Sequence, residues 1–219
     1  MKKKIWSFII AVLAVTAVCS AQTERIKGDY YFYRKTHNNE VVSLGYNSLL
    51  LHNVKGSGTE TLHGVSLDYD RLISVCQHSP LFVQTGIGFS TYFGKKAVTP
   101  HVADWTEKEK MYFVTAKVPV SLGYKINFNN QDFIFPYMGL YLRSGLWGHY
   151  LVGDEELDAF SQSTVGTENR VRYLQCGYAY GVKFAIGQIS LGIGIEKDFN
   201  HFMRDTRMTV NRINIGYIF

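Results

Sequence analysis

A strict alternation of bulky apolar residues with small or polar ones constrains this chain more than any other feature. In residues 189–196, isoleucine or leucine occupies every second position, and serine, glycine and glutamate occupy the positions between. Residues 112–126 and 178–186 repeat the pattern, with mainly valine and tyrosine on one face and mainly small residues or lysine on the other. A period of two is the spacing of side chains along a β-strand, so these segments are predicted to be strands with one apolar face.

The same pattern predicts eight strands, at residues 41–51, 62–71, 80–93, 111–126, 132–147, 171–186, 188–198 and 208–219. The connections after the first, third, fifth and seventh strands are the longer ones, led by Gly94–Lys110 and Gly148–Arg170. The connections after the second, fourth and sixth strands are mostly tight. An even strand number, with short turns at one rim and long loops at the other, predicts an all-β fold, an eight-stranded antiparallel up-and-down transmembrane β-barrel with a filled lumen.

The composition of the two faces favours lipid outside this barrel. A water-facing exterior would be rich in lysine, glutamate and threonine, whereas the polar face here is largely glycine and alanine with isolated charges, which suits a crowded lumen. Tyr112 and Tyr124 lie twelve residues apart, a vertical separation of about 30 Å at a strand tilt of ~40°. That spacing fits two interfacial girdles. A soluble periplasmic barrel that carries a small apolar ligand is the alternative.

The N-terminus has the layout of a secretory signal peptide. Three lysines follow Met1, an apolar run extends from Ile5 to Val18, and small residues precede Gln22. We therefore expect residues 1–21 to be a signal peptide, with Gln22 as the mature N-terminus. A retained anchor helix would need ~20 apolar residues. Lipidation at Cys19 would require a small residue before it, where Val18 stands.

Residues 22–40 are expected to be a periplasmic lead-in, and residues 41–219 the outer-membrane barrel domain. The aromatic run Asp29–Lys35 has no place in a strand of the barrel and is either part of the lead-in or a short plug. The whole chain has 23 basic and 18 acidic residues, and loss of residues 1–21, which hold three lysines and no acid, would leave 20 and 18. This near balance gives no reason to expect a nucleic-acid partner.

Charged residues on the inward faces are the candidate functional groups of the lumen. They are Asp68, Asp70, Lys117, Lys125, Arg143, Lys183, Glu196 and Arg212. They either line a pathway or pair with one another and with tyrosines such as Tyr141, and pairing is favoured because an unpaired buried charge is costly. The five bases exceed the three acids, so some bases are expected to reach water or loop carbonyls. Arg71 has outward parity near the short-turn rim, where it can snorkel to head groups.

Enzyme chemistry finds little support in the sequence, and no catalytic, cofactor-binding or metal-binding residue is assigned. A hydrolase would need a nucleophile activated by an oriented histidine. The seven histidines, at 37, 52, 63, 78, 101, 149 and 201, do not stand in the patterns of lipid-modifying barrels, although His149 and His201 lie near the long-loop rim beside acids. The acidic run Gly153–Asp158 could hold calcium but lacks the ligand spacing of an EF-hand loop, which favours a solvated loop.

The chain's last strand carries the most specific resemblance. In residues 211–219, Ile213, Ile215, Tyr217 and Phe219 share one face, with phenylalanine at the terminus. This segment is similar to the C-terminal strand of outer-membrane barrels, and residues 64–69, 82–88, 116–124 and 136–139 are similar to the small outer-membrane β-barrel (porin-like) family of Gram-negative bacteria. The resemblance implies location in the cell outer membrane, contact with outer-membrane lipid, and recognition of the strand ending at Phe219 by the barrel assembly machinery.

Function is expected to reside in the loops. A lumen that contains both signs of charge favours a structural or surface-interaction barrel, with an extracellular or envelope protein as partner, over an open diffusion pore. A small-solute or ligand pore would be favoured by a ring of charges of one sign. A lipid-modifying outer-membrane enzyme is the weaker alternative.

The two cysteines of the expected mature chain test the strand order. Cys76 falls in a short-turn connection, whereas Cys176 has the outward parity of the sixth strand, on the opposite side of the barrel. A disulfide needs Cα atoms within about 7 Å. We therefore expect two free thiols, with Cys76 reactive toward a water-soluble maleimide and Cys176 protected by lipid until the barrel unfolds. A Cys76–Cys176 disulfide in a peptide map would contradict the proposed strand order.

Overall fold

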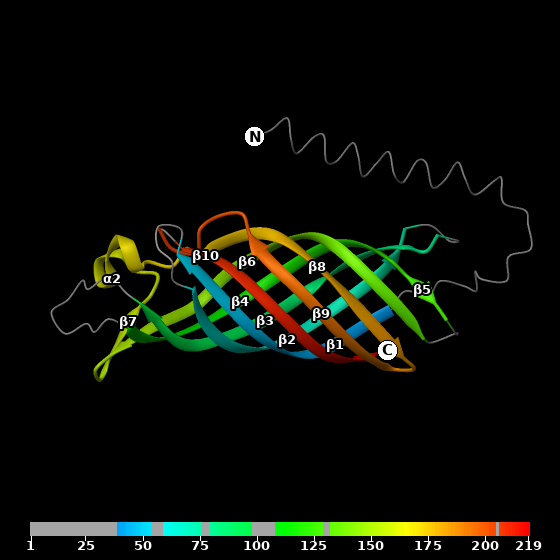
Figure 1. Ribbon diagram of the computed structural model, residues 1–219, viewed down its shortest axis with the longest axis horizontal. Helices are drawn as coiled ribbons and strands as arrows, with labels where there is room; N and C mark the ends of the chain where they lie inside the picture. Colours follow the sequence, from blue (N-terminus) through cyan, green and yellow to red (C-terminus); the bar gives the residue numbers. More distant parts are fainter. Residues whose placement is uncertain (1–38, 54–58, 76–78, 98–107, 129–131, 205) are drawn as a thin grey trace, which may run out of the picture.

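Eight long antiparallel strands form the wall of a barrel in the computed structural model, which describes residues 39–53, 59–75, 79–97, 108–128, 132–204 and 206–219 (Figure 1). The expected signal peptide, residues 22–38 with the run Asp29–Lys35, and Cys76 lie outside the described residues. The eight strands are β1 (Asn39–Asn53), β2 (Thr59–Ser74), β3 (Leu81–Ala97), β4 (Lys108–Tyr124), β6 (Phe133–Val152), β8 (Leu174–Ile186), β9 (Ile189–Asp198) and β10 (Thr206–Ile218).

The barrel closes where the first strand, β1, pairs with the last strand, β10. The order around the wall is β4, β3, β2, β1, β10, β9, β8 and β6, and β6 pairs back with β4. The first and last strands pair along their whole length, from Val41 opposite Ile218 to Asn53 opposite Thr206. Each long strand therefore has two hydrogen-bonded neighbours, as lipid demands of a spanning sheet. The predicted eight-stranded up-and-down topology is confirmed.

The two ends of the barrel differ as predicted. At one end, which we call the short-turn end, β2 is followed by β3, β4 by β6 and β8 by β9, and Asn39 and Phe219 lie at this end too. The connection from β4 to β6 holds the two-residue strand β5 (Ile126–Asn127), and the connection from β8 to β9 turns at Gly187, whose φ is +59°. At the opposite end, which we call the loop end, β1 is followed by β2, β3 by β4, β6 by β8 and β9 by β10, and the described residues 153–173 and 199–204 lie there, on the left of Figure 1.

The strand β6 continues beyond residue 147, where the alternation predicted its end. A β-bulge interrupts the alternation there but does not end the strand. Thr115 of β4 pairs with Gly145 and Val114 pairs with Trp147, so Leu146 is an extra residue between them. Leu146 and Trp147 are consequently both exposed, and buried positions change from odd to even numbers beyond the bulge. The alternation breaks where the predicted strand ended, at 147, yet the hydrogen-bonded ladder continues to Val152.

The connection expected to be a long loop at Gly148–Arg170 is largely folded. After Val152 the chain turns at Gly153, whose φ is +60°, and returns along β6 as the short strand β7 (Glu155–Asp158). The helix α2 (Gln162–Asn169) follows. The sequence predicted the length of this connection but not its folded structure, because the burial of Ala159, Phe160 and Val165 depends on tertiary contacts that a short polar segment does not reveal.

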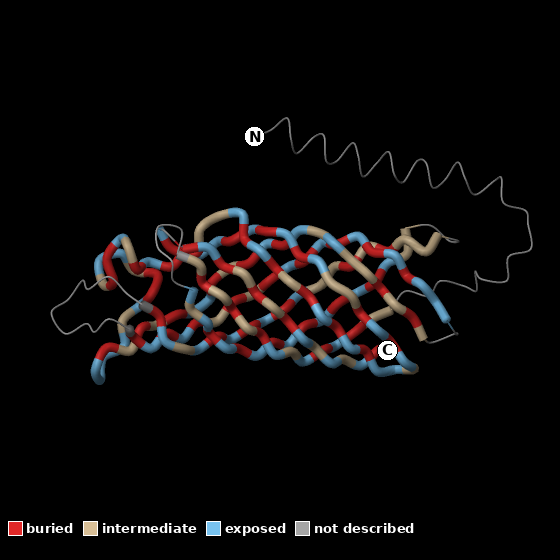
Figure 2. Tube along the Cα trace, in the orientation of Figure 1, coloured by how far each residue is buried: buried red, intermediate tan, exposed pale blue. Residues whose placement is uncertain are grey.

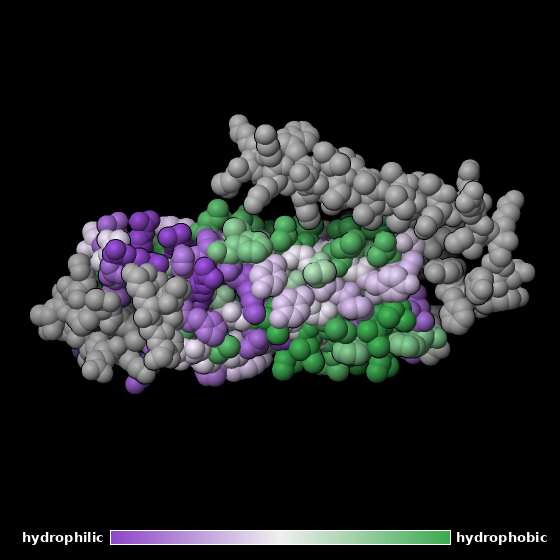
Figure 3. All heavy atoms as spheres, turned by 45° about the horizontal axis from the view of Figure 1, so that its top comes forward, coloured by the Kyte–Doolittle hydropathy of each residue, from purple (hydrophilic) through white to green (hydrophobic). Residues whose placement is uncertain are grey.

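Side chains alternate between the lumen and the outer wall along every long strand (Figure 2). Most outward apolar residues form a belt, and on the face shown in Figure 3 they gather on the half of the barrel nearer the short-turn end, interspersed with less hydrophobic residues, whereas polar residues cover the loop end. The belt includes Val42, Leu44, Val65, Leu67, Ile87, Phe89, Val118, Val120, Leu140, Leu142, Phe184, Leu191, Ile193, Ile213 and Ile215. A contiguous apolar surface of this size on a closed barrel faces lipid.

Aromatic residues stand on both sides of the belt. Tyr46, Tyr112, Trp147 and Tyr178 are exposed on its loop side, and Tyr69, Tyr124, Tyr217 and Phe219 are exposed on its short-turn side. This arrangement confirms the two girdles inferred from the spacing of Tyr112 and Tyr124.

Two outward side chains lie where their parity predicted. Arg71 is exposed at the short-turn end, with Nε 3.5 Å from Glu40 Oε1. Cys176 is a free, exposed cysteine on the outer wall of β8, and β2 is separated from β8 by β1, β10 and β9. Within the described ranges, no helix has the length and apolar character needed to cross a membrane.

A charge in the middle of the belt should destabilise the barrel. Leu67 is half exposed to lipid, so we expect Leu67→Arg to lower the free energy of unfolding by about 2–4 kcal/mol in lipid vesicles. The control is Thr61→Arg, on the same outward face of β2 but beyond the belt, which should change it by less than about 1 kcal/mol. Urea unfolding followed on an unheated detergent gel measures both. Equal effects of the two substitutions would mean that the belt does not face lipid.

Candidate functional site

The lumen consists of three layers that together fill it. An apolar loop-end cluster and an apolar short-turn cluster close its two ends, and a network of buried charges lies between them. The charged residues of this central network are Asp68, Asp70, Lys117, Arg143, Lys183, Glu196, Asp198 and Arg212, all at most 8% exposed. They come from six strands, β2, β4, β6, β8, β9 and β10, so the network ties opposite walls together.

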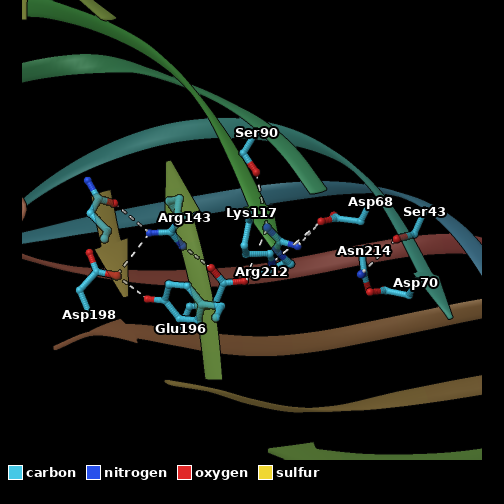
Figure 4. Close-up of polar contacts among 12 residues, drawn as sticks. Ser43, Asp68, Asp70, Ser90, Lys117, Arg143, Glu196, Asp198, Arg212 and Asn214 are labelled. Carbon is cyan, nitrogen blue, oxygen red and sulfur yellow. Dashed lines mark hydrogen bonds and ion pairs between the residues drawn. The ribbon is translucent and has the colours of Figure 1, made fainter. Parts of the chain in front are cut away.

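Glu196 is the centre of the network, because its carboxylate contacts three cations (Figure 4). Lys117 Nζ donates a hydrogen bond to Oε1 at 2.5 Å, and Arg212 Nη2 lies 3.6 Å from the same oxygen. Arg143 Nη2 donates to Oε2. Both oxygens are therefore engaged by positive charge, which offsets part of the cost of removing this carboxylate from water.

The other three acids of the network each have a cationic partner. Arg212 Nη1 donates to Asp68 Oδ1 at 2.7 Å, and Lys183 Nζ donates to Asp70 Oδ2 at 2.6 Å. Arg143 Nη1 lies 3.4 Å from Asp198 Oδ1.

Tyr141 also takes part in the network, as the sequence suggested. Its hydroxyl donates a hydrogen bond to Asp198 Oδ1. Its ring lies under the guanidinium of Arg143, 4.8 Å from Cζ to the ring centroid. Pairing of the luminal charges with one another and with a tyrosine is therefore what the structure shows.

Asp198 adds a fourth acid to the three expected, so the central network holds four acids and four bases, and Lys125 is the expected base that lies outside it. Asp198 was missed, although its position two residues after Glu196 gives it the same inward parity. It is the last residue of β9, and at the end of a strand the alternation is a weaker guide to which side a residue faces than in the middle.

Lys125, the fifth expected base, lies apart from the network at the short-turn end. Its Nζ donates to Asn39 Oδ1 at 2.5 Å and lies 4.4 Å from the centroid of Phe133 and 5.2 Å from that of Phe82. Burial against these rings lowers the pKa of Lys125 from its ordinary value to about 8.

Glycines make room for the large polar side chains of the network. A Cβ on Gly88 would lie 2.1 Å from Asp68 Oδ1, and one on Gly194 would lie 2.7 Å from the Tyr137 hydroxyl. The inward glycines therefore leave room for neighbouring side chains, as the sequence suggested. A larger residue at these positions would displace those side chains.

The short-turn cluster is aromatic. Phe82 and Phe135 meet edge to face with centroids 6.5 Å apart, and Tyr137 stacks on Phe135 at 6.1 Å. The remaining members are Val41, Leu72, Phe133, Ala185 and Ile218.

The loop-end cluster is larger and includes part of the folded connection. Residues 153–173, which we call the cap, contribute Phe160, Val165 and Val171 to it. Tyr150 of β6 donates its hydroxyl hydrogen to the carbonyl of Asn169 at 3.0 Å. Barrel residues complete the cluster, namely Leu49, Leu51, Leu62, Tyr92, Met111, Phe113, Tyr150, Val152, Phe202, Met203, Met208 and Val210.

The groups that the sequence offered for catalysis or metal binding have other contacts in the structure. His149 lies against Trp147, with ring centroids 4.4 Å apart, and pairs in register with Asp158. The acidic run at Gly153–Asp158 forms the β6–β7 hairpin, in which Asp158 Oδ1 accepts a hydrogen bond from the Phe160 amide at 2.9 Å. Among the described residues, no three His, Cys, Asp or Glu side chains converge as metal ligands would.

Comparison with known proteins finds matches in structure but not in sequence. No protein-family model and no curated protein matches the chain. Neisserial surface protein A matches with a TM-score of 0.52 at 14% identity, over 82% of this chain and 97% of that one. Ail, the attachment invasion locus protein of Yersinia pestis, gives 0.47 at 13% identity, over 84% and 100%. A major outer membrane protein from Thermus thermophilus gives 0.48 at 13%, over 84% and 100%.

The closed eight-stranded wall, the apolar belt and the filled lumen define a small β-barrel of the outer-membrane type. The likeness to Neisserial surface protein A supports the same fold. The resemblance found in the sequence is confirmed at this level, and the protein is an outer-membrane β-barrel.

Neutralising the central carboxylate should destabilise the barrel strongly. We expect Glu196→Gln to lower the free energy of unfolding by ~3–5 kcal/mol, since it leaves three buried cations without their shared partner. The control is Glu156→Gln on the exposed hairpin, which should have almost no effect. Urea unfolding in vesicles measures both variants. A Glu196→Gln midpoint equal to that of the unmodified protein would show that the network contributes nothing to stability.

Proposed function

We propose that this protein is a non-conducting outer-membrane barrel that presents a folded surface at its loop end to an extracellular or envelope protein. The observation that carries the proposal is the filled lumen. Two apolar clusters and a charge-balanced network occupy successive layers of it. A wall closed around packed side chains leaves the loop end as the part that can act on another molecule.

The cap supports a surface role because it is anchored to the barrel. The amide of Arg172 donates to the Phe202 carbonyl at 2.9 Å, and the amide of Gly145 donates to the Tyr173 carbonyl at 2.7 Å. Tyr150 of β6 donates its hydroxyl hydrogen to the Asn169 carbonyl of the cap at 3.0 Å. A surface fixed in this way loses little conformational entropy when a partner binds.

The exposed face of the cap is polar and carries a concentration of negative charge. Asp154, Glu155 and Glu156 are exposed on the β6–β7 hairpin. Arg204 of the adjacent loop donates a hydrogen bond to Glu168 of α2, which joins the cap to the β9–β10 connection. A partner with a basic surface suits the hairpin.

Export and assembly follow the same proposal. We infer that residues 1–21 direct secretion in a Gram-negative cell and that the barrel assembly machinery recognises the last strand. The outward face of β10 supports this, since Ile213, Ile215, Tyr217 and Phe219 are all exposed. Phe219 ends beside β1, where its amide donates to the carbonyl of Glu40 at 2.9 Å.

Conductance tests the closed lumen. The purified mature protein in a planar bilayer is expected to show negligible single-channel current, because paired side chains and apolar clusters fill the path. A porin of known conductance in the same bilayer is the control. Steady openings on the nanosiemens scale would contradict the proposal and support a small-solute pore.

The surface role is tested separately in cells. A strain that lacks the gene is complemented with the unmodified protein, with Glu156→Lys on the cap, or with Glu40→Lys at the opposite rim as a charge-matched control. We expect Glu156→Lys to fail in restoring adhesion or envelope integrity, whereas Glu40→Lys restores both. If the two variants restore them equally, the cap is not the interacting surface.

A further inference from the structure

A hollow on the outer wall of the barrel is not explained by the closed lumen or by the cap. Its volume is about 600 Å³, and it is formed mainly by outward residues of β8, β9, β10 and β1 together with Phe199, with the inward residues Asp198 and Met208 also in its lining. Among the residues that line it are His52, Tyr178, Tyr180, Lys197, Phe199 and Arg207. A volume of this order accommodates a small organic group.

The hollow is basic. Lys197 and Arg207 are exposed, and neither has an ion pair or hydrogen bond with the described residues of the chain. The register brings them close, because Lys197 pairs with Thr209, two residues along β10 from Arg207, and Arg207 pairs with His52 of β1.

Among the described residues that line the hollow, no carboxylate pairs with these two cations. Asp198 lines it, but its side chain is fully buried and bonded to Arg143 and Tyr141 in the lumen. On the described outward faces of β1, β8, β9 and β10, Glu40 is the acidic residue, and it lies at the short-turn end. The hollow is therefore suited to an anion.

Aromatic rings form one side of the hollow. Tyr178 stacks on Tyr180 with centroids 6.2 Å apart and packs against Phe199 at 5.6 Å. Tyrosines at this depth combine an apolar ring with a polar hydroxyl, which suits the boundary between lipid tails and head groups.

The hollow lies at the loop-side edge of the belt. Along the outward face of β10, Arg207, Thr209 and Asn211 give way to Ile213 and Ile215. Along β9, Lys197 follows the exposed isoleucines and leucine of residues 189–193. The basic groups therefore stand at the level of lipid head groups, directly above acyl chains.

We propose that this hollow binds the phosphate-bearing head group of a lipid in the leaflet on the loop side of the membrane. Lys197 and Arg207 hold the phosphate through charge-assisted hydrogen bonds, and Tyr178, Tyr180 and Phe199 contact the apolar part of the head group. The acyl chains continue along the belt past Ile193 and Ile213. The position of the hollow at the belt edge selects a lipid over a free anion, because only a lipid gains both contacts.

The test measures lipid retained by the full mature protein in detergent. Phosphatidylglycerol is titrated into the purified barrel, and bound lipid is counted by native mass spectrometry. Phosphatidylcholine serves as the zwitterionic comparison, and inorganic phosphate serves as the free anion. The Lys197→Gln, Arg207→Gln double variant should bind phosphatidylglycerol roughly 30-fold more weakly than the unmodified protein.

A matched control removes the same charge elsewhere on the loop half of the wall. Lys95 and Lys110 are also exposed and paired in register, on β3 and β4, so the Lys95→Gln, Lys110→Gln variant should retain binding. The charge-conserving variant Lys197→Arg, Arg207→Lys should retain it too, and a heat-dependent gel shift shows that each variant is folded. Equal binding by the two glutamine variants would overturn the proposal. Competition by inorganic phosphate as strong as that of the lipid would overturn the assignment to a lipid.

Discussion

Hydrogen bonding of the backbone in a medium without water is the constraint on which the rest of this structure depends. A strand that crosses lipid must pair on both edges, so the sheet must close. Closure here is made by the pairing of β1 with β10. With eight strands the enclosed space is narrow, and side chains must fill it. The inward glycines leave room for the large inward side chains. At Gly88, for example, a Cβ would collide with the carboxylate of Asp68.

Charge pairing in the lumen follows from that narrow space. A lumen filled by side chains has little water to solvate an ion, so each buried charge needs a partner within the wall. Glu196 meets this need for three cations at once, and Asp198 completes the balance. Because these groups belong to strands far apart around the barrel, the network also fixes the shape of its cross-section.

The wall could be predicted from the sequence because lipid and lumen impose opposite chemistry on alternate residues. Each of the eight expected strands is present, and the expected inward charges are all buried. What could not be predicted depends on contacts between distant segments. The bulge at Leu146 flips the parity that the alternation relies on, and the cap folds because Phe160 and Val165 are buried by the barrel. The alternation predicts that Lys125 faces inward. Its contact with the ring of Phe133 depends on how the chain packs just after β4, which the pattern does not show.

The pairing of the first strand with the last also sets an order of events in time. Val41 cannot pair with Ile218 until the residues of β10 have been synthesised, so the seam between β1 and β10 forms later than the pairings between strands that are neighbours in sequence. Contacts between residues so distant along the chain form slowly. Until these contacts form, the apolar residues of the belt remain exposed to water. A protein built in this way depends on being kept unfolded and soluble before it reaches the membrane, and the delay is inherent in the geometry of a closed ring.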